Sequence, residues 1–298
     1  MLQMIRSDFC MFILSHGRAN NVVTVDSLLR HGYTGKFFIV IDDEDKQRSE
    51  YEQRYGDKVL VFSKAEVEKT FDVGDNFPER RAVIWARNAC FELAAQVNCK
   101  YFMQLDDDYI RFQFRFDRNC RFGTWDAKDL DEALEWMIEY YDSIPALSIC
   151  LAQGGDFIGG TNGGFGKAIT AKRKAMNTFL CRVDRPFKFV GRINEDVNTY
   201  TSLGHRGSLF LTLTCLMIVQ KITQSNAGGM SEMYLASGTY IKSFYSVMYQ
   251  PSSVKISDMG EVHRRIHHSI DWETTVPQII RQSYRKPGND NAVTDDAA

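Results

Sequence analysis

Three consecutive carboxylates, Asp106, Asp107 and Asp108, follow the apolar run 101–105 and are the strongest candidates for chemistry in this sequence. An apolar run that ends abruptly in acidic residues is typical of a buried strand that delivers them to the edge of a sheet. Adjacent carboxylates repel one another, and a divalent cation such as Mg²⁺ or Mn²⁺, shared with a substrate phosphate, would relieve that cost. Because side chains alternate along a strand, we expect Asp106 and Asp108 to point one way and Asp107 the other. A solvated acidic turn is the alternative.

A second carboxylate pair, Glu195 and Asp196, lies among polar and glycine residues between Gly191 and Val197. A carboxylate in such a setting is a candidate general base, and Asp196 could deprotonate an attacking hydroxyl. The alternative is that both acids cap a helix over 197–203.

Basic residues suggest two kinds of anion contact. Arg87 and Asn88 lie on a predicted helix and could contact a diphosphate, since arginine is suited to bidentate phosphate binding. Between Gly166 and Arg192 there are eight basic residues and one acid, with phenylalanines between them. This composition favours a polyanionic partner, with basic groups for phosphates and aromatic rings for bases. Solvated arginines and a solvated basic surface are the alternatives.

Three of the six histidines, His263, His267 and His268, lie between Glu261 and Trp272 together with two arginines. Such a grouping more often marks a phosphate or metal site than a set of structural side chains.

Alternating apolar runs and helical patterns must position these groups. Apolar runs at 9–14, 36–41, 58–62 and 101–105 predict strands, with helices predicted at 21–31, 47–55 and 79–97. This order predicts a doubly wound α/β sheet whose ligands bind beyond the carboxyl ends of the strands. Residues 15–18, Asp42 and Asp106 to Asp108 would then share one rim. Further predicted elements are strands at 110–116, 147–151 and 209–220, and helices at 129–141 and 277–284.

Composition sets the broad class. The chain has 298 residues, of which 44% are hydrophobic and 25% charged, as in ordinary globular proteins, and its net charge of −2 does not indicate a nucleic-acid binder. Seven cysteines without a CxxC pair favour neither a zinc site nor a disulfide framework, so a reducing cytoplasm is expected. No secretory signal or membrane-spanning run is evident, and 286–298 reads as a disordered tail.

Four motifs together resemble a known family: residues 13–19 (ILSHGRA), 32–35 (GYTG), 104–109 (QLDDDY) and 268–272 (HSIDW). They resemble the TET-associated glycosyltransferases of bacteriophages, within the GT-A glycosyltransferases, and the resemblance spans residues 8–286. It implies a single GT-A domain over 1–285, with a Rossmann-like, doubly wound mixed sheet and flanking helices. The nucleotide-sugar half would cover about 1–125 and the acceptor half about 126–285.

The resemblance also implies an activity. It is the metal-dependent transfer of a sugar from a nucleotide-sugar, expected to be a UDP-sugar, to 5-hydroxymethylcytosine or a related hydroxymethylpyrimidine in phage DNA. Mn²⁺ or Mg²⁺ would be the cofactor, and the cytoplasm of the infected host the location.

The implied roles fall into four sets. Asp108 and His263 would bind the metal, with His267 and His268 as rivals to His263, and Asp196, beside Glu195, would be the base. The donor would contact Ser15, Arg18, Asp42, Arg87, Asn88, Asp106, Asp107, His267 and His268. DNA would contact Lys167, Lys172, Arg173, Lys174 and Arg192.

Three alternatives stay open. The same fold could act on a protein or glycan acceptor, or the chain could be a non-catalytic module that binds nucleotide-sugar or DNA. A nucleotidyltransferase would also use Asp-x-Asp, but it would release diphosphate instead of a nucleoside diphosphate.

Overall fold

The computed structural model describes residues 5–78, 80, 82–157, 160, 169–170, 172–221, 241–259 and 265–277. Lys167, His263 and the tail 286–298, on which predictions were made, lie outside these residues. Within the described part of the chain, no helix is both long and apolar enough to cross a membrane.

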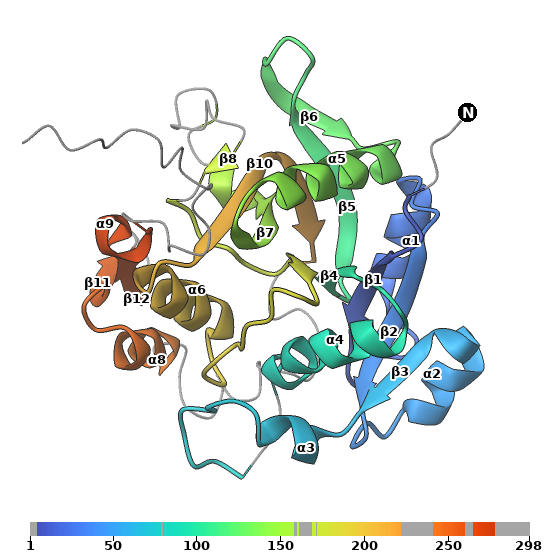
Figure 1. Cartoon of the computed structure of the whole chain (residues 1–298), viewed down its shortest axis with the longest axis horizontal. Helices are drawn as coiled ribbons and strands as arrows, with labels where there is room; N and C mark the ends of the chain where they lie inside the picture. Colours follow the sequence, from blue (N-terminus) through green and yellow to red (C-terminus); the bar gives the residue numbers. More distant parts are fainter. Residues whose placement is uncertain are drawn as a thin grey trace, which may run out of the picture.

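One large mixed sheet organises the molecule (Figure 1). Its first half is parallel and comprises β3 (Val59–Phe62), β2 (Lys36–Asp42), β1 (Phe9–Leu14) and β4 (Tyr101–Asp106). The antiparallel strand β9 (Phe179–Arg182) joins β4 to β7 (Ala146–Gln153), and β7 runs parallel to β10 (Leu209–Gln220). The far edge is formed by β5 (Tyr109–Phe116) and β6 (Phe122–Asp126), while β8 (Ile169–Thr170) pairs with β10.

Helices cover both faces of the sheet, as the strand–helix alternation predicts. The central strand β1 shows why: Met11 and Ile13 enter one core with α1 (Val23–Arg30) and α5 (Leu130–Ser143). Its alternate residues Cys10 and Phe12 enter the other core with α4 (Ile84–Gln96). A strand that is apolar at every position can bury both faces in this way. The mixed α/β architecture predicted for a GT-A protein is therefore confirmed.

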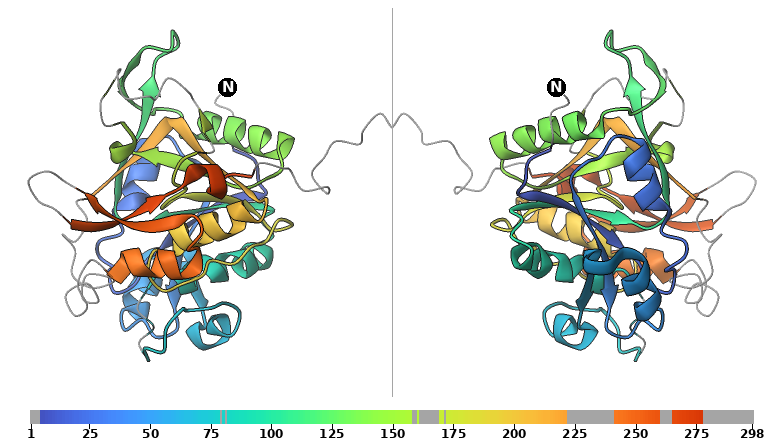
Figure 2. Two further views of the ribbon diagram at one scale, coloured as in Figure 1. Left: turned by 90° about the vertical axis from the view of Figure 1, so that its left-hand side faces the viewer. Right: turned by 90° about the vertical axis from the view of Figure 1, so that its right-hand side faces the viewer.

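Smaller elements complete the fold. They are α2 (Arg48–Tyr55), η1 (Gly56–Lys58), α3 (Lys64–Glu68), η2 (Gly154–Phe157), α6 (Glu195–His205), α8 (Ile241–Tyr249) and α9 (Trp272–Thr275). A separate two-stranded sheet pairs β11 (Val254–Met259) with β12 (Arg265–Ile270). Figure 2 shows this small sheet against α6 and α8, which brings the histidine-bearing strand β12 to the start of α6.

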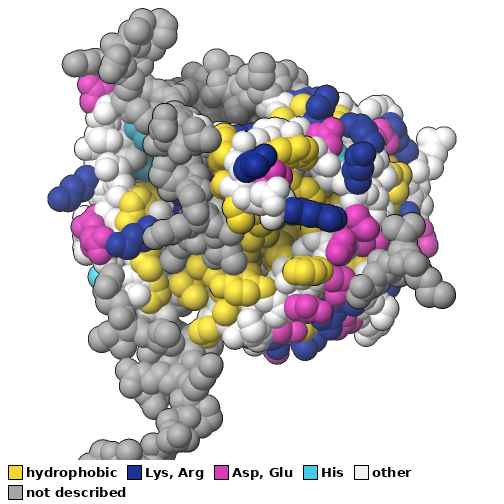
Figure 3. Space-filling model, turned by 90° about the horizontal axis from the view of Figure 1, so that it is seen from above, with side chains coloured by type: hydrophobic (Ala, Val, Ile, Leu, Met, Phe, Trp, Pro, Cys, Tyr) yellow, Lys and Arg dark blue, Asp and Glu magenta, His cyan; other side chains and the backbone are white. Residues whose placement is uncertain are grey.

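Apolar side chains gather beside α5 on the face seen in Figure 3. A cavity of about 680 Å³ opens there between α5 and the strands β5, β7 and β10. Its lining includes Phe114, Leu213 and Trp136, and Trp136 is 70% exposed. Among the residues that the structure describes, those predicted for the site do not line this cavity.

Candidate active site

The acidic turn after β4 is held by the first turn of α1. Thr24 donates its hydroxyl to the Asp106 carbonyl at 2.6 Å and accepts the Tyr109 backbone N–H at 2.9 Å. The Thr24 backbone N–H, one of the donors that a helix start leaves without a partner inside the helix, bonds the Asp107 carbonyl at 3.2 Å. The backbone of the three aspartates is therefore fixed from one side of the sheet.

Asp107 points into the protein and organises the loop after β1. Its carboxylate accepts from the Ser15 hydroxyl at 2.6 Å and from Arg18 Nη1 at 2.8 Å. The Tyr51 hydroxyl lies 2.7 Å from the same Ser15 oxygen and accepts the Arg18 backbone N–H at 2.8 Å. The Asp107 side chain is only 3% exposed, so it braces Ser15 and Arg18.

Asp106 and Asp108 have more open carboxylates. The Asp106 side chain is 30% exposed and lies 3.4 Å from Arg87 Nη2. Burial and the charges of Asp108 and Asp107 raise the pKa of Asp106 to about 6, although Arg87 opposes this. Burial and Asp107 also raise the pKa of Asp108. Asp106 and Asp107 thus have different partners, as alternation along the strand predicts.

Hard oxygen donors of this kind fit Mg²⁺ or Mn²⁺, which takes one or two protein carboxylates and completes its shell with water and substrate phosphates. Among the described residues, no group of three His, Cys, Asp or Glu side chains could hold a metal unaided. A metal ion at this site would therefore need further ligands, either from the substrate or from residues such as His263 that lie outside the described residues.

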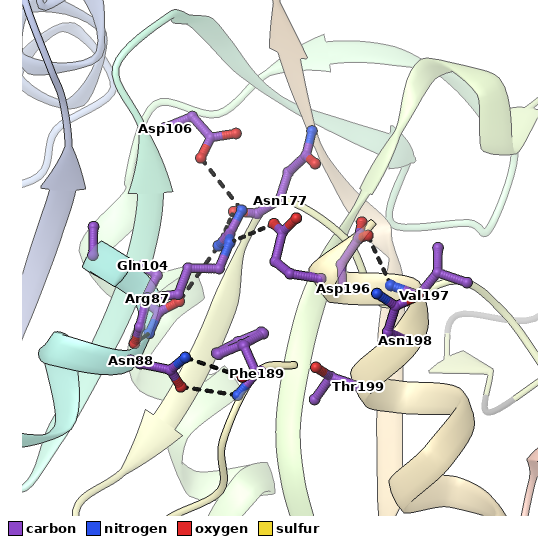
Figure 4. A network of polar contacts seen from close by, with 12 residues as sticks. Arg87, Asn88, Gln104, Asp106, Asn177, Phe189, Asp196, Val197, Asn198 and Thr199 are labelled. Carbon is purple, nitrogen blue, oxygen red and sulfur yellow. Dashed lines mark hydrogen bonds and ion pairs between the residues drawn. The ribbon is translucent and has the colours of Figure 1, made fainter. Parts of the chain in front are cut away.

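Arg87 connects the acidic turn to the start of α6 (Figure 4). Its Nε donates to Glu195 Oε1 at 3.0 Å, while Nη1 lies 3.3 Å from the Asn177 carbonyl and 3.4 Å from Gln104 Oε1. The side chain is only 2% exposed, yet the carboxylates of Asp106 and Glu195 outweigh this burial and raise the pKa of Arg87. One permanently charged group is thus shared between two carboxylates.

Glu195 and Asp196 open α6 and differ in their partners. Glu195 is held by Arg87, and burial together with Asp196 raises the pKa of Glu195 to about 7 against the effect of Arg87. Asp196 Oδ1 accepts its hydrogen bond from the Val197 backbone N–H at 2.7 Å, and burial raises the pKa of Asp196. No described side chain bonds the Asp196 carboxylate, whereas Arg87 bonds that of Glu195.

Asn88 lies beside Arg87 on α4 but faces the protein backbone. Its amide nitrogen donates to the Phe189 carbonyl at 3.0 Å, and its amide oxygen accepts the Phe189 N–H at 2.9 Å. The side chain is buried with both amide ends occupied, so it positions the chain that leads toward α6.

Asp42 reaches the same rim from the end of β2. Its Oδ2 lies 2.6 Å from His16 Nδ1, and its Oδ1 lies 3.0 Å from Lys64 Nζ. Burial alone would raise the pKa of Asp42, but the bonds from His16 and Lys64 outweigh burial and lower it. Asp42 is therefore a charged group covered by its two neighbours.

The two described histidines of β12 stack on each other, with ring centroids 4.3 Å apart. His268 is 6% exposed, and its Nδ1 lies 3.4 Å from the Asn194 amide nitrogen and its Nε2 3.4 Å from Lys174 Nζ. Burial and the nearby charge of Lys174 lower the pKa of His268 to about 3. His268 thus links β12 to the residue before Glu195.

Several described basic residues between Gly166 and Arg192 form ion pairs with acidic residues of the same chain. Arg192 is 1% exposed and its Nε lies 2.9 Å from Asp75 Oδ2, so our prediction of an Arg192–DNA contact is corrected: that guanidinium is buried in an internal ion pair. Arg173 Nε bonds Asp156 at 2.7 Å, and the exposed Lys172 pairs with Glu273. Among the described members, the charge of Lys174 acts on the predicted base, since it lowers the pKa of Asp196 against the effect of burial.

Comparison with known proteins gives one family match. The model of a family described as TET-Associated Glycosyltransferase matches residues 9–229. No curated protein matches the sequence.

Solved structures with a similar chain trace include two of glucosyl-3-phosphoglycerate synthase from Mycobacterium tuberculosis. The complex with Mg²⁺ and UDP is 7% identical with a TM-score of 0.45, covering 89% of this chain and 88% of that chain. The complex with Mn²⁺, UDP and phosphoglyceric acid is 10% identical with a TM-score of 0.44, covering 89% and 87%.

Proposed function

The chain belongs to the TET-associated glycosyltransferase family, and we propose that it transfers a sugar from a nucleotide-sugar to the hydroxyl of a 5-hydroxymethylpyrimidine in DNA. 5-Hydroxymethylcytosine is the proposed acceptor and a UDP-sugar the proposed donor. The nucleotide-sugar half would lie at about 1–125 and the acceptor half at about 126–285.

One observation supports this proposal above the others. The buried Arg87 touches Asp106 at the end of β4 and Glu195 at the start of α6, so the acidic turn and the Glu195–Asp196 pair belong to one site. A transferase needs this combination, because a cation-binding turn serves the diphosphate of the donor and a carboxylate serves the hydroxyl of the acceptor.

The donor would lie across the rim formed by Ser15, Arg18 and the acidic turn. Asp108 would hold Mn²⁺ or Mg²⁺, with His263 as a further ligand, and Asp106 would contact the donor. When bound, the ion would stabilise the negative charge that develops on the leaving diphosphate.

Asp196 would act on the acceptor. In an inverting reaction it takes the proton of the hydroxymethyl group as that oxygen bonds the anomeric carbon of the sugar. The bond between that carbon and the diphosphate oxygen breaks, and a nucleoside diphosphate leaves. Glu195, fixed by Arg87, would keep Asp196 oriented, and in a retaining reaction the pair would instead orient the acceptor.

DNA must present its base outside the stack, either flipped from a duplex or single-stranded. The described cations that we propose for the DNA backbone are Lys174, whose charge acts on the pKa of Asp196, and the exposed Lys172. Lys167, outside the described residues, stays a further proposed contact. A protein or glycan acceptor is the second candidate, and it is favoured by the pairing of Arg192 and Arg173 inside the protein.

The test is release of nucleoside diphosphate from a panel of UDP-sugars with Mn²⁺, with and without DNA containing 5-hydroxymethylcytosine. Wild type should release more product with modified DNA than with unmodified DNA, and Asp196→Asn should lose this stimulation. Glu139→Gln, at an exposed position of α5, is the control. Release that is indifferent to DNA would move the acceptor to a protein or glycan.

A further inference from the structure

The hairpin formed by β5 and β6 carries positive charge that the proposed mechanism does not use. Residues 109–126 contain four arginines and two acids, in a chain whose net charge is −2. Figure 1 shows this hairpin extending beyond the body of the molecule, at one edge of the large sheet. The hairpin is therefore a locally basic element that a partner can reach from outside.

The turn at the tip of the hairpin is fixed by Asp117. Its Oδ1 accepts the backbone N–H of Asn119 and that of Arg121, both at 2.8 Å, and its carbonyl accepts the Cys120 N–H at 2.9 Å. The Asp117 N–H in turn bonds the Arg121 carbonyl at 3.0 Å. The Asp117 carboxylate thus serves the turn itself, and it holds the backbone that carries Arg118 and Arg121.

Arg118 and Arg121 are the available cations of this turn. Both residues are exposed, and within the described part of the chain neither guanidinium pairs with a carboxylate. The other two arginines of the hairpin differ, since Arg115 donates to a threonine hydroxyl of β6 at 2.7 Å and Arg111 lies 3.9 Å from Asp126. Exposed guanidinium groups are suited to phosphates, which they bind through two parallel N–H groups.

The same hairpin presents an exposed aromatic ring. Trp125 of β6 is 43% exposed and pairs across the strands with Phe114. Its ring covers the backbone of Gly123, because a Cβ added at Gly123 would lie only 2.2 Å from Trp125 Cη2. The glycine therefore leaves room for the indole to lie against the hairpin. An indole held in this way is a platform on which an unpaired base can stack.

The hairpin is continuous with the candidate active site. β5 begins at Tyr109, directly after the acidic turn, and the Lys221 N–H that follows β10 bonds the Asp108 carbonyl at 3.2 Å. The 8 residues of β5 separate the acidic turn from the tip, which corresponds to about 25 Å at the rise of a strand. Phosphates of a helical DNA strand are about 3.4 Å apart along the axis, so about seven nucleotides span this distance.

We propose that the β5–β6 hairpin binds the DNA strand that carries the target base, with Arg118 and Arg121 on its phosphates and Trp125 stacked on an unpaired base. This inference rests on the proposed function, because it takes DNA as the acceptor. Charge complementarity supports it, since Arg173 and Arg192 are paired inside the protein whereas the hairpin offers its cations to a polyanion. Exposed cations together with an aromatic ring are the combination by which proteins bind single strands.

The experiment measures the Kd of a single-stranded DNA without hydroxymethylated bases, by fluorescence anisotropy at several salt concentrations. The double variant Arg118→Gln/Arg121→Gln should bind about tenfold more weakly, and its slope of log Kd against log salt should fall by about 1.4, because two phosphate contacts are lost. Trp125→Ala should also bind about tenfold more weakly but keep the wild-type slope, since a stacking contact releases no counterions.

The matched control is the double variant Arg48→Gln/Arg54→Gln on α2. These two arginines are also exposed, and α2 leads into β3, at the opposite edge of the sheet from β6. The same change in net charge at that edge should leave Kd and slope close to wild type. The thermal unfolding midpoint of Arg118→Gln/Arg121→Gln should equal that of wild type, because both side chains are exposed.

The inference would be overturned by a wild type that does not bind the oligonucleotide, by an unchanged Kd or slope in Arg118→Gln/Arg121→Gln, or by an equal loss in the α2 control. An unchanged Kd in Trp125→Ala would overturn the stacking contact. Because the DNA lacks the proposed acceptor group, this outcome is separate from that of the proposed function. A hairpin that binds DNA in a protein that transfers no sugar to it would support the inference and contradict the proposed acceptor.

Discussion

Arg87 Nε donates to Glu195 Oε1 at 3.0 Å, although 108 residues separate the two in the chain. The same guanidinium lies 3.4 Å from Asp106. This buried contact joins the two clusters that the sequence presents separately, the acidic turn after β4 and the carboxylate pair that opens α6.

Replacing Arg87 by Met should destabilise the protein by about 3–5 kcal/mol, because it leaves buried carboxylates without their cation. Urea unfolding of both proteins gives the difference in free energy of unfolding. Arg48→Met is the control, since Arg48 forms an exposed pair with Glu52 that should contribute about 1 kcal/mol or less. Equal stability of the two variants would contradict the proposed role of Arg87.

Glu195 predicts a pH dependence of stability. Its pKa is raised to about 7 in the folded protein from an ordinary value of 4.5, so folding favours the protonated form. The resulting stabilisation is fully present below pH 4.5 and is lost as the pH rises through about 7. Between these values the free energy of unfolding should fall more in wild type than in Glu195→Gln, as measured by denaturant titrations at several pH values. Parallel pH profiles would show that this carboxyl titrates normally.

Metal removal tests the acidic turn. A chelator should abolish donor turnover, and Mn²⁺ should restore it in wild type but not in Asp108→Asn. The turnover rate of Asp108→Asn should be reduced about 100-fold or more. The readout is release of nucleoside diphosphate. Asp57→Asn, at an exposed position after α2, should behave as wild type, and full activity of Asp108→Asn would remove this residue from the metal site.

Thr24 should affect both stability and turnover, because it holds the backbone of the acidic turn. Its hydroxyl bonds the Asp106 carbonyl and the Tyr109 N–H, so Thr24→Val leaves two buried backbone groups without this partner. We expect a loss of about 1–3 kcal/mol in thermal or urea unfolding, together with reduced turnover. Thr124→Val, an exposed threonine of β6 that bonds Arg115, should have a smaller effect. A larger effect at Thr124 would argue against this role.

Local patterns predicted the elements well. The apolar run 9–14 is β1, the run 209–220 is β10, and the predicted helix 129–141 is α5 over Leu130–Ser143. The family indicated by the four motifs is confirmed by the family match. The predicted helix 79–97 begins only at Ile84, and Arg80, before it, pairs with Glu44 and Glu68.

Side-chain partners far apart in the chain could not be predicted. Arg192 and Asp75 are 117 residues apart, and nothing near either residue indicates that they pair. Tyr51 bonds the loop after β1 from a helix whose pattern is merely polar. Gln104 gave a weak indication of a polar partner, because it is a polar residue within an apolar run. Its Oε1 accepts a hydrogen bond from Arg87 Nη1. Long-range ion pairs arise from the tertiary arrangement, which periodicity does not encode.

The most direct test of the central claim is mass analysis of nucleosides from 5-hydroxymethylcytosine DNA after incubation with the enzyme, Mn²⁺ and the donor that it hydrolyses. The account predicts a glycosylated 5-hydroxymethyl-2′-deoxycytidine that forms with wild type and is absent with Asp196→Asn. Release of nucleoside diphosphate with every nucleoside unchanged would contradict it, because the sugar would then have gone to an acceptor other than DNA.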